Sequence, residues 1–282
     1  MSDSSPRHPP LDTLPEPEPE APAGRGGAEV AGADTVTTAR GQTIEIELTR
    51  AQHTFARRVA ESQATIPQLT LRAEVDLESR LAAHEHATAS APAEQAAPAT
   101  CTGEIVKACA LALREHPRVN STYRDGRVQM HSRVNIGVAV PVEGGGAGAP
   151  DASTEGTTAI APTVFDADRL TVEETAREID HLQVRALEGI LSPPELSGAT
   201  FTVFDLSAFG VDSFTATVPP GQTAILAIGS LRSRPVALDD GRLAVHRIAT
   251  LTLSCDHRVL YGADAARFLT RIREPLEASA VL

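Results

Sequence analysis

The stretch LSCDHRVLYGADAARFL, residues 253–269, decides how this sequence is interpreted. An apolar run leads into Asp256, His257 and Arg258, and Gly262 then allows a sharp change of direction into a helical pattern. A histidine at the end of a buried strand is held by its scaffold, so its neutral imidazole can accept a proton. The alternative is a structural histidine whose ring is satisfied by backbone groups. The stretch therefore predicts a strand, a turn and a helix, with His257 as a candidate base.

The segments upstream of this motif carry strand and helix patterns in irregular alternation. Alternating or continuous apolar runs predict strands over 44–48, 68–77, 134–142, 201–206, 223–229 and 248–255. Apolar residues at helical spacing predict helices over 54–63, 103–116 and 172–190. In the first helix, we expect Phe55, Val59 and Ala60 to point inward. Asp125-Gly126 and Asp239-Asp240-Gly241 predict hairpin turns. Together these patterns predict an α+β fold with a mixed sheet.

Residues 1–42 differ in composition from the rest of the chain. They carry seven of the 20 prolines, together with Glu and Ala, and they lack apolar periodicity. Such a segment cannot bury enough apolar surface to fold, so we predict a disordered tail over 1–42 and one folded domain over 43–282. Within that domain, 86–99 reads as a low-complexity linker and 144–156 as a mobile loop.

The composition excludes several functional classes. The net charge is −12, which would repel nucleic acid. No apolar run approaches the roughly 20 residues of a membrane span, and the N-terminus lacks the pattern of a signal peptide. Cys101, Cys109 and Cys255 show no metal-ligand spacing and cannot all pair, which favours a reducing compartment. We therefore expect a cytoplasmic protein without a metal site, a nucleic-acid partner or a membrane partner.

DHRVLYG resembles the DHRxxDG motif near the C-terminus of the dihydrolipoamide acyltransferase (E2) catalytic domain of 2-oxoacid dehydrogenase complexes, a relative of chloramphenicol acetyltransferase. Other stretches also resemble this family: FARRVAES, LALREHPRVNSTY, NIGVAV, DADRLTVEETAREI, GATFTVFDLSAFGVDSF and PPGQTAILAIG. The resemblance extends over residues 43–282. It implies a chloramphenicol-acetyltransferase-like mixed sheet flanked by helices, with the active site at a trimer interface.

The resemblance also assigns roles to the motif residues. It implies that His257 is the base that deprotonates an acceptor thiol or hydroxyl, which then attacks the thioester of acyl-CoA. Coenzyme A is therefore the expected co-substrate. Asp256, Arg258 and Gly262 would be structural, with ion pairs of Asp256 and Arg258 fixing the loop. Tyr261 stands where the family usually has Asp or Asn, but some members carry Tyr there, and we keep it as a catalytic candidate.

A second departure from the family lies in FTVFDLSAFG, where the family's FTxSNLG supplies a serine hydroxyl to the tetrahedral oxyanion. Phe204 stands at the serine position, Asp205 at the asparagine and Ser207 at the glycine. A phenyl ring cannot donate a hydrogen bond, and losing one oxyanion donor costs about 10²–10³ in rate. Three alternatives follow: Thr202, Ser207 or a backbone N–H substitutes, the enzyme is slow, or it is inactive.

The lysine content bears on the identity of the acceptor. Lys107 is the only lysine among 25 basic residues, and it lies inside the apolar run EIVKACALAL. Lipoylation needs an exposed lysine on a hairpin, so we expect no covalently bound lipoyl group. Stand-alone relatives in natural-product pathways, including tetronate pathways, acetylate a hydroxyl. We therefore expect a CoA-dependent acyltransferase, most simply an acetyltransferase, acting on a hydroxyl of a small-molecule or carrier-bound intermediate. The alternatives are a dihydrolipoamide acyltransferase core that uses a separate lipoyl carrier, and a catalytically dead structural core.

The length of the folded part predicts self-association. Acyltransferases with a His-based motif and two fused halves are nearly twice as long, so a unit of about 240 residues has to complete its cleft with a neighbour. We expect a homotrimer in which His257 of one subunit faces residues 201–206 of the next. Larger assemblies of trimers, built through the apolar terminus Ala280-Val281-Leu282, are a further expectation.

Overall fold

The computed structural model describes residues 35–38, 41–44, 47–90, 101–143, 157–238 and 240–278. The chain divides into two compact units, Met1–Glu47 and Leu48–Leu282. In the first unit, β1 (Thr35–Thr38) pairs antiparallel with β2 (Gly41–Ile44). These two strands overlap the C-terminal end of segment 1–42, which the sequence predicted to be a disordered tail. The prediction for the rest of 1–42 stays a prediction, because residues 1–34 and 39–40 are outside the described residues.

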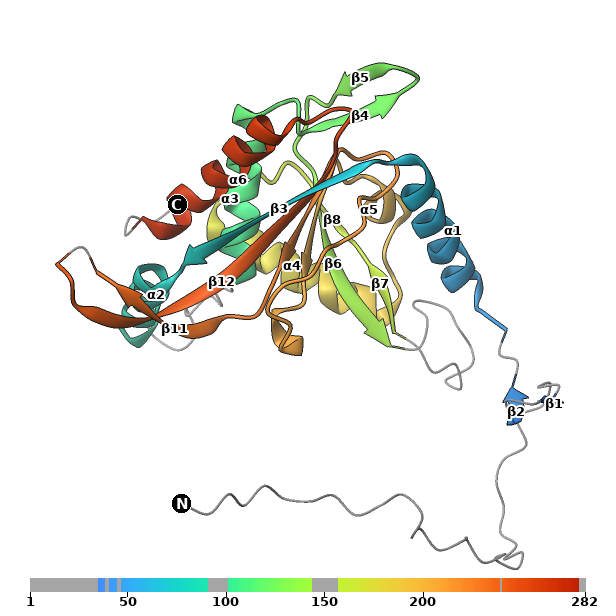
Figure 1. Cartoon of the computed structure of the whole chain (residues 1–282), viewed down its shortest axis with the longest axis horizontal. Coiled ribbons are helices and arrows are strands. Elements are labelled where there is room, and N and C mark those ends of the chain that lie inside the picture. Colours follow the sequence, from blue (N-terminus) through green and yellow to red (C-terminus); the bar gives the residue numbers. More distant parts are fainter. Residues whose placement is uncertain are drawn as a thin grey trace, which may run out of the picture. The chain divides into compact units, whose positions relative to one another are not determined.

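One mixed sheet of eight strands forms the centre of the second unit (Figure 1). Its strands are β3 (Gln68–Asp76), β6 (Ile136–Glu143), β7 (Thr157–Ile160), β8 (Thr163–Val164), β9 (Phe201–Asp205), β10 (Ala224–Ile228), β11 (Arg232–Ala237) and β12 (Leu243–Asp256). The main order is β11-β12-β10-β9-β6-β7, while β3 pairs with β12 and β8 with β6. Strand β9 runs parallel to β6 and β10, and the other pairs are antiparallel. The predicted α+β fold with a mixed sheet is confirmed.

Three of the helices pack together against one face of this sheet. The helices are α1 (Arg50–Thr65), α2 (Glu78–Ser90), α3 (Cys101–Glu115), α4 (Val172–Glu188), α5 (Pro193–Ser197), α6 (Gly262–Glu277) and the 3-10 turn η2 (Ser207–Phe209). Helix α3 packs against both α4 and α6, and all three lie behind the sheet in Figure 1. A separate hairpin, β4 (Ser121–Arg124) and β5 (Arg127–Met130), follows α3. Helix α2 continues to Ser90, into the predicted linker; residues 91–100 and the predicted loop 144–156 lie outside the described residues.

The main core lies between the sheet and these helices. Along β12, Leu251, Leu253 and Cys255 are fully buried against it. Phe201 of β9 and Phe268 of α6 meet edge to face, with ring centroids 5.8 Å apart. Full burial of a Leu or Phe side chain stabilises a fold by about 1.5–3 kcal/mol. The core therefore anchors the end of β12 and the start of α6, which together carry the DHR motif.

A smaller apolar cluster occupies the other face of the sheet. It comprises Ile66, Ala216, Val218, Ile225 and Ala227, with Phe204 and Phe214 packed against it. Residues 213–218, named here the covering segment, supply three of these side chains. Immediately before the segment, the chain comes so close to the sheet that a Cβ added at Gly229 would meet the carbonyl oxygen of Asp212 at 2.0 Å. Glycine is therefore required where the chain crosses the end of β10.

Local signals in the sequence account for several element boundaries. Asp125 and Gly126 adopt φ values of 49° and 77°, as a two-residue hairpin with a type I′ turn requires. Helix α4 begins at a capping box between Thr171 and Glu174. In α1 the predicted inward orientation is wrong for this chain, because Phe55 is 47% exposed and Ala60 is also exposed.

Candidate active site

His257 stands at the end of β12, as the sequence predicted. Its backbone N–H donates to the carbonyl oxygen of Pro67 at 2.9 Å, and the N–H groups of Val259 and Leu260 donate to that of Asp256. The residue is nevertheless exposed. Neither ring nitrogen has a hydrogen-bond partner within the described part of the chain. The turn thus fixes the backbone of His257 and leaves its imidazole accessible to a substrate.

The flanking residues Asp256 and Arg258 form a partly buried ion pair. The Arg258 guanidinium donates to the two carboxylate oxygens of Asp256, with its Nη2 at 2.7 Å and its Nε at 2.9 Å and 3.2 Å. Asp256 is only 1% exposed, and the guanidinium lies 4.0 Å from the ring centroid of Tyr123. This carboxylate raises the pKa of Arg258 above its usual range. The pair thus clamps the turn that carries His257.

Tyr261 borders His257 on the other side of the turn. It is the N-cap residue of α6 but makes no side-chain cap bond, and Gly262 is the first residue of the helix. The Tyr261 ring meets the His257 ring at 60° with centroids 6.2 Å apart, and the Arg118 guanidinium lies 5.9 Å from its centroid. Tyr261 therefore contributes an aromatic edge to the site, next to a cation.

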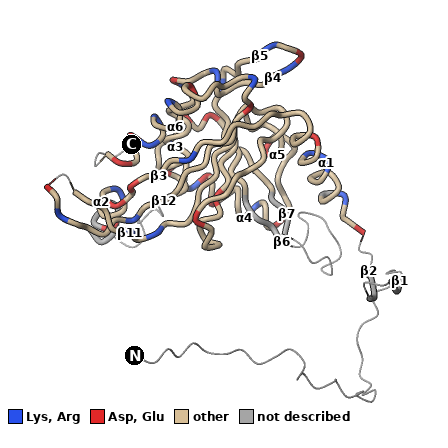
Figure 2. The backbone as a smooth tube through the Cα atoms, viewed as in Figure 1, with Lys and Arg blue, Asp and Glu red and all other residues tan. Residues whose placement is uncertain are grey.

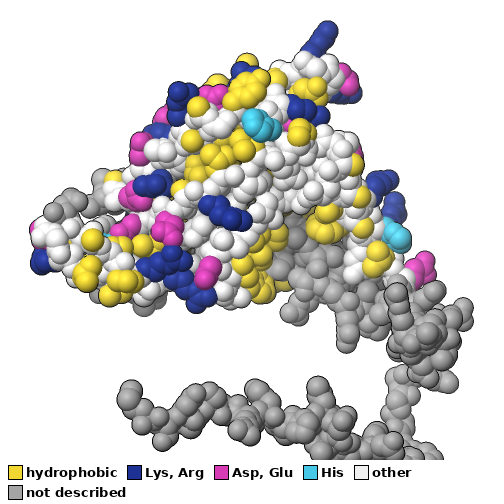
Figure 3. All heavy atoms as spheres, viewed as in Figure 1, with side chains coloured by type: hydrophobic (Ala, Val, Ile, Leu, Met, Phe, Trp, Pro, Cys, Tyr) yellow, Lys and Arg dark blue, Asp and Glu magenta, His cyan; other side chains and the backbone are white. Residues whose placement is uncertain are grey.

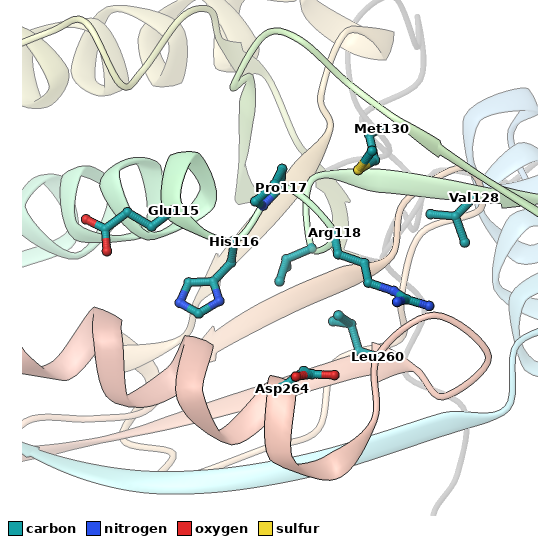
Figure 4. A pocket seen from close by; sticks show the side chains of 9 residues that line it. Glu115, His116, Pro117, Arg118, Val128, Met130, Leu260 and Asp264 are labelled. Atoms are coloured by element: carbon teal, nitrogen blue, oxygen red, sulfur yellow. The ribbon is translucent and has the colours of Figure 1, made fainter.

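A pocket of about 550 Å³ lies next to this turn (Figure 4). It is formed by the end of α3, strand β5 and the start of α6, and its lining residues are Glu115, His116, Pro117, Arg118, Val119, Val128, Met130, Leu260 and Asp264. Leu260 and Asp264 connect it to the motif, because they lie on either side of Tyr261 in the chain. None of the site residues predicted from the sequence lines it. The stretch HPRV after α3 was the available signal, but nothing in it indicates that residues of β5 and α6 line a pocket with it.

The oxyanion candidates differ in whether their hydrogen-bonding groups are free. The Thr202 hydroxyl donates to Gln222 Oε1 at 2.8 Å, and it is buried. Asp205 accepts from the Thr102 hydroxyl and, at 2.8 Å, from the backbone N–H of Ser207. Phe204 has no polar group; its ring meets that of Phe214 at 88° with centroids 5.2 Å apart.

The Ser207 hydroxyl is the remaining candidate side-chain donor. It has no hydrogen-bond partner in the described ranges, and the residue is partly exposed at the start of η2. Its backbone is fixed on both sides, because its carbonyl oxygen also accepts from the Ser230 hydroxyl at 2.8 Å. Ser207 therefore presents a free hydroxyl on an immobilised backbone.

A single chain does not bring His257 and the oxyanion candidates together. Ala227 in β10 pairs with both Phe204 in β9 and Thr252 in β12, so Phe204 is level with Thr252 and two strands away from it. His257 lies five positions further along β12, which corresponds to about 16 Å at roughly 3.3 Å per residue. His257 and Phe204 are also two strand spacings apart across the sheet. They are therefore too far apart in one chain to contact the same reacting carbonyl group.

Lys107 is buried inside α3 and only 8% exposed. Its ammonium group donates to the carbonyl oxygen of Asp168 at 2.9 Å, and burial lowers its pKa. The other charged residues, both basic and acidic, are distributed over many of the helices and strands (Figure 2). Among the described residues, no cluster of His, Cys, Asp and Glu could hold a metal ion, and no helix is long and apolar enough to cross a membrane.

Comparison with known proteins places this site in a family context. The model of the family "2-oxoacid dehydrogenases acyltransferase (catalytic domain)" matches residues 40–282. The dihydrolipoyllysine-residue acetyltransferase component of the pyruvate dehydrogenase complex of Zymomonas mobilis is 34% identical, over 82% of this chain and 49% of that protein. The corresponding component of the acetoin cleaving system of Bacillus subtilis is 32% identical, over 84% of this chain and 56% of that protein. The chain thus spans about half the length of these relatives.

Solved structures show the same fold. A probable dihydrolipoamide acetyltransferase from Listeria monocytogenes is 31% identical with a TM-score of 0.73, covering 83% of this chain and 94% of that one. The dihydrolipoamide acetyltransferase of Azotobacter vinelandii is 28% identical with a TM-score of 0.75, covering 84% and 93%. In that enzyme a serine, a histidine and an asparagine were investigated for their role in catalysis. The histidine and asparagine are four positions apart, as His257 and Tyr261 are here.

These relatives overturn one expectation from the sequence. We expected transfer to a hydroxyl of a small-molecule or carrier-bound intermediate, as in natural-product pathways that include those for tetronates. That expectation is wrong, since the matching proteins are dihydrolipoyl acetyltransferase components. The error has a clear origin. The burial of Lys107 shows only that this lysine cannot present a lipoyl group. It says nothing about whether the domain accepts a lipoyl group presented by another segment.

Proposed function

Because the chain belongs to the family of 2-oxoacid dehydrogenase acyltransferase catalytic domains, we propose that it transfers an acetyl group between coenzyme A and a dihydrolipoyl thiol. The observation that carries this proposal is the accessible imidazole of His257 on its fixed turn at the end of β12. The corrected acceptor agrees with the names of the relatives, and it is the dehydrogenase-type alternative that the sequence had left open.

The proposed reaction needs one base and one oxyanion donor. A neutral ring nitrogen of His257 takes the proton from the dihydrolipoyl S–H, and the thiolate attacks the carbonyl carbon of acetyl-CoA. A tetrahedral oxyanion forms, and its collapse breaks the carbon–sulfur bond to coenzyme A. The imidazolium then returns its proton to the departing coenzyme A thiolate. Proton removal by a positioned base contributes about 10²–10⁴ to the rate.

We assign the oxyanion donor to the Ser207 hydroxyl. Thr202 is buried and donates to Gln222, and Asp205 has no proton to donate while ionised. Ser207 lies three positions after Phe204, which occupies the place of the family serine. Its hydroxyl has no partner among the described residues, while its backbone is held by Asp205 and Ser230. A donor that is already fixed costs little reorganisation when charge develops on the substrate.

The lipoyl group must be presented by a lysine other than Lys107. That amine is buried in α3 and hydrogen-bonded to a backbone carbonyl. Presenting it to solvent would require α3 to leave the core. The proposal therefore includes a separate lipoyl-bearing segment or protein as the partner, with coenzyme A as the second substrate.

The proposed active site is shared between subunits of a homotrimer. Within one chain, His257 and Ser207 belong to different ends of the sheet, as the register of β9, β10 and β12 requires. A neighbouring copy that places its residues 201–207 opposite His257 would complete the site. In support, the catalytic core of the pyruvate dehydrogenase complex, 28% identical with a TM-score of 0.75 over 85% of this chain and 93% of that one, is a cubic assembly.

The test is acetyl transfer from acetyl-CoA to free dihydrolipoamide, followed as formation of S-acetyl-dihydrolipoamide. His257→Ala should lower turnover by about 10²–10⁴, and Ser207→Ala by about 10²–10³. His181→Ala is the matched control, because that imidazole is also exposed but lies on α4. The proposed mechanism fails if His257→Ala retains the wild-type rate. No transfer by the wild type would instead favour a structural core, for which Phe204 is the supporting feature.

A further inference from the structure

The pocket beside the turn of His257 combines apolar side chains with titratable ones. Its volume of about 550 Å³ falls within the range of about 300–1,000 Å³ in which proteins bind small molecules. Its apolar lining comprises Pro117, Val119, Val128, Met130 and Leu260. On the face seen in Figure 3, hydrophobic and basic side chains lie side by side at the end of the molecule that carries β4 and β5. None of these apolar side chains has a role in the proposed acetyl transfer.

The two carboxylates of the lining are already paired with arginines that lie outside it. Glu115 accepts from Nε and Nη2 of Arg271 at 2.7 Å and 2.8 Å, and these hydrogen bonds lower the pKa of Glu115. Figure 4 shows its carboxylate pointing away from the other labelled side chains. Asp264 accepts from Nη1 of Arg267, three positions further along α6, at 3.1 Å. Neither carboxylate therefore brings an uncompensated negative charge to the pocket.

Arg118 is a lining cation with no anionic partner in the described part of the chain. Its guanidinium faces the Tyr261 ring at 5.9 Å from the centroid, and it makes no ion pair or hydrogen bond with a described residue. The ring nitrogens of His116 likewise have no partner there. In Figure 4 the Arg118 side chain extends between Val128 and Leu260. The pocket thus presents a planar fork of N–H donors next to apolar side chains.

We propose that this pocket binds a monocarboxylate with a short apolar chain. A guanidinium holds a planar carboxylate through two parallel N–H···O bonds, and the apolar chain would cover Val128 and Met130. One uncompensated cation matches a single negative charge, whereas a phosphate dianion would keep one charge unpaired beside Glu115 and Asp264. The site goes beyond the proposed function and does not depend on it, since His257 is not among the lining residues.

A ligand in this pocket would also act on the catalytic candidate Tyr261. The Tyr261 ring lies between two groups of the site, with the Arg118 guanidinium 5.9 Å and the His257 ring 6.2 Å from its centroid. A carboxylate bound to Arg118 competes with the contact between this cation and the ring. Leu260, which precedes Tyr261, lines the pocket as well. Binding should therefore change the surroundings of Tyr261 together with those of the apolar wall.

Hexanoate and methyl-labelled methionine test the proposal by NMR. Met130 is one of two methionines in the chain, so its methyl resonance is identified by its loss in Met130→Leu. Hexanoate should shift this resonance and the Tyr261 ring resonances with one affinity. Hexanamide, which lacks the charge, should bind at least about 10-fold more weakly. Acetate, which lacks most of the apolar chain, should also bind at least about 10-fold more weakly.

Several results of this titration would overturn the proposal. An unchanged Met130 resonance means that the pocket stays empty. Equal affinities for hexanoate and hexanamide mean that Arg118 does not recognise the charge. A shift of Met130 without a shift of Tyr261 places the ligand away from Arg118. None of these readouts needs acetyl transfer, so a failure of the proposed function leaves the test valid.

Variants locate the bound carboxylate. Arg118→Gln should weaken hexanoate binding at least about 10-fold and abolish the preference over hexanamide. Arg127→Gln is the matched control, because Arg127 is an exposed arginine of β5 that does not line the pocket, and it should keep the wild-type affinity. His257→Ala should keep it as well; loss of binding there would place hexanoate at the reacting centre and overturn the proposal. If circular dichroism shows Arg118→Gln to be unfolded, the comparison of hexanoate with hexanamide on the wild type decides.

Discussion

Replacing Arg258 with methionine should destabilise the domain by about 3 kcal/mol. The guanidinium makes three contacts of 2.7–3.2 Å with the Asp256 carboxylate, which is 1% exposed. Without it, that carboxylate keeps the backbone N–H of residue 258 as a donor, at 2.9 Å. Removing one partner of a buried ion pair costs about 3–5 kcal/mol. The lower end applies because the Arg258 side chain is 33% exposed, and water can partly replace it.

Urea unfolding at fixed protein concentration measures this change as a difference in the free energy of unfolding. Arg242→Met is the matched control, because it removes an ion pair with Asp240 in which both side chains are more than half exposed. We expect that control to lose less than about 1 kcal/mol. The double variant Asp256→Asn/Arg258→Met should be more stable than Arg258→Met, because no unpaired charge remains buried. A loss below about 1 kcal/mol for Arg258→Met would refute the claim that this pair clamps the turn.

Three further predictions concern packing, pH and thiol reactivity. Gly229→Ala should lower Tm by several degrees, because its Cβ would meet the Asp212 carbonyl oxygen at 2.0 Å; an unchanged Tm would contradict the close crossing. The hydrogen bond from Arg247 lowers the pKa of Glu78 from 4.5, so its stabilisation is present above that pH and is lost as the pH falls through the lowered pKa. Arg247→Met should therefore lower Tm at about pH 7 but progressively less toward about pH 3, and a constant difference would refute this origin. Burial raises the pKa of Cys255 to about 12, so iodoacetamide at about pH 8 should label it after unfolding but not before.

The sequence predicted those parts of the fold that depend on local patterns. Alternation in β3 places Leu71 toward the core and Arg72 outward, and Asp125-Gly126 forms the expected turn. The patterns also identified β3, β6, β9, β10 and the C-terminal half of β12, but not β7, β8 or β11. They did not reveal the separation of His257 from Phe204, because that depends on the register of three strands that are distant in the chain.

Other features could not be derived from periodicity at all. Phe55 fits a helical stripe, but periodicity does not distinguish a face buried within one chain from a face left open on it. The pocket beside Tyr261 arises where the end of α3, β5 and α6 meet, so no single segment encodes it. The covering segment is short and is followed directly by Pro219-Pro220. Its alternation of inward and outward residues is therefore too brief to indicate a strand from the sequence.

The burial of Lys107 has a chemical consequence for a protein that handles activated acyl groups. Thioesters slowly acylate free amines, and the side chains of this chain contain one primary amine in 282 residues. That amine lies in the core with its pKa lowered, hydrogen-bonded to a backbone oxygen. Arginine, which carries the remaining positive charge, is a poor nucleophile because its guanidinium stays protonated. The folded surface thus offers acyl-CoA no lysine to modify by accident, and amine-directed crosslinkers and dyes would find only the α-amino group.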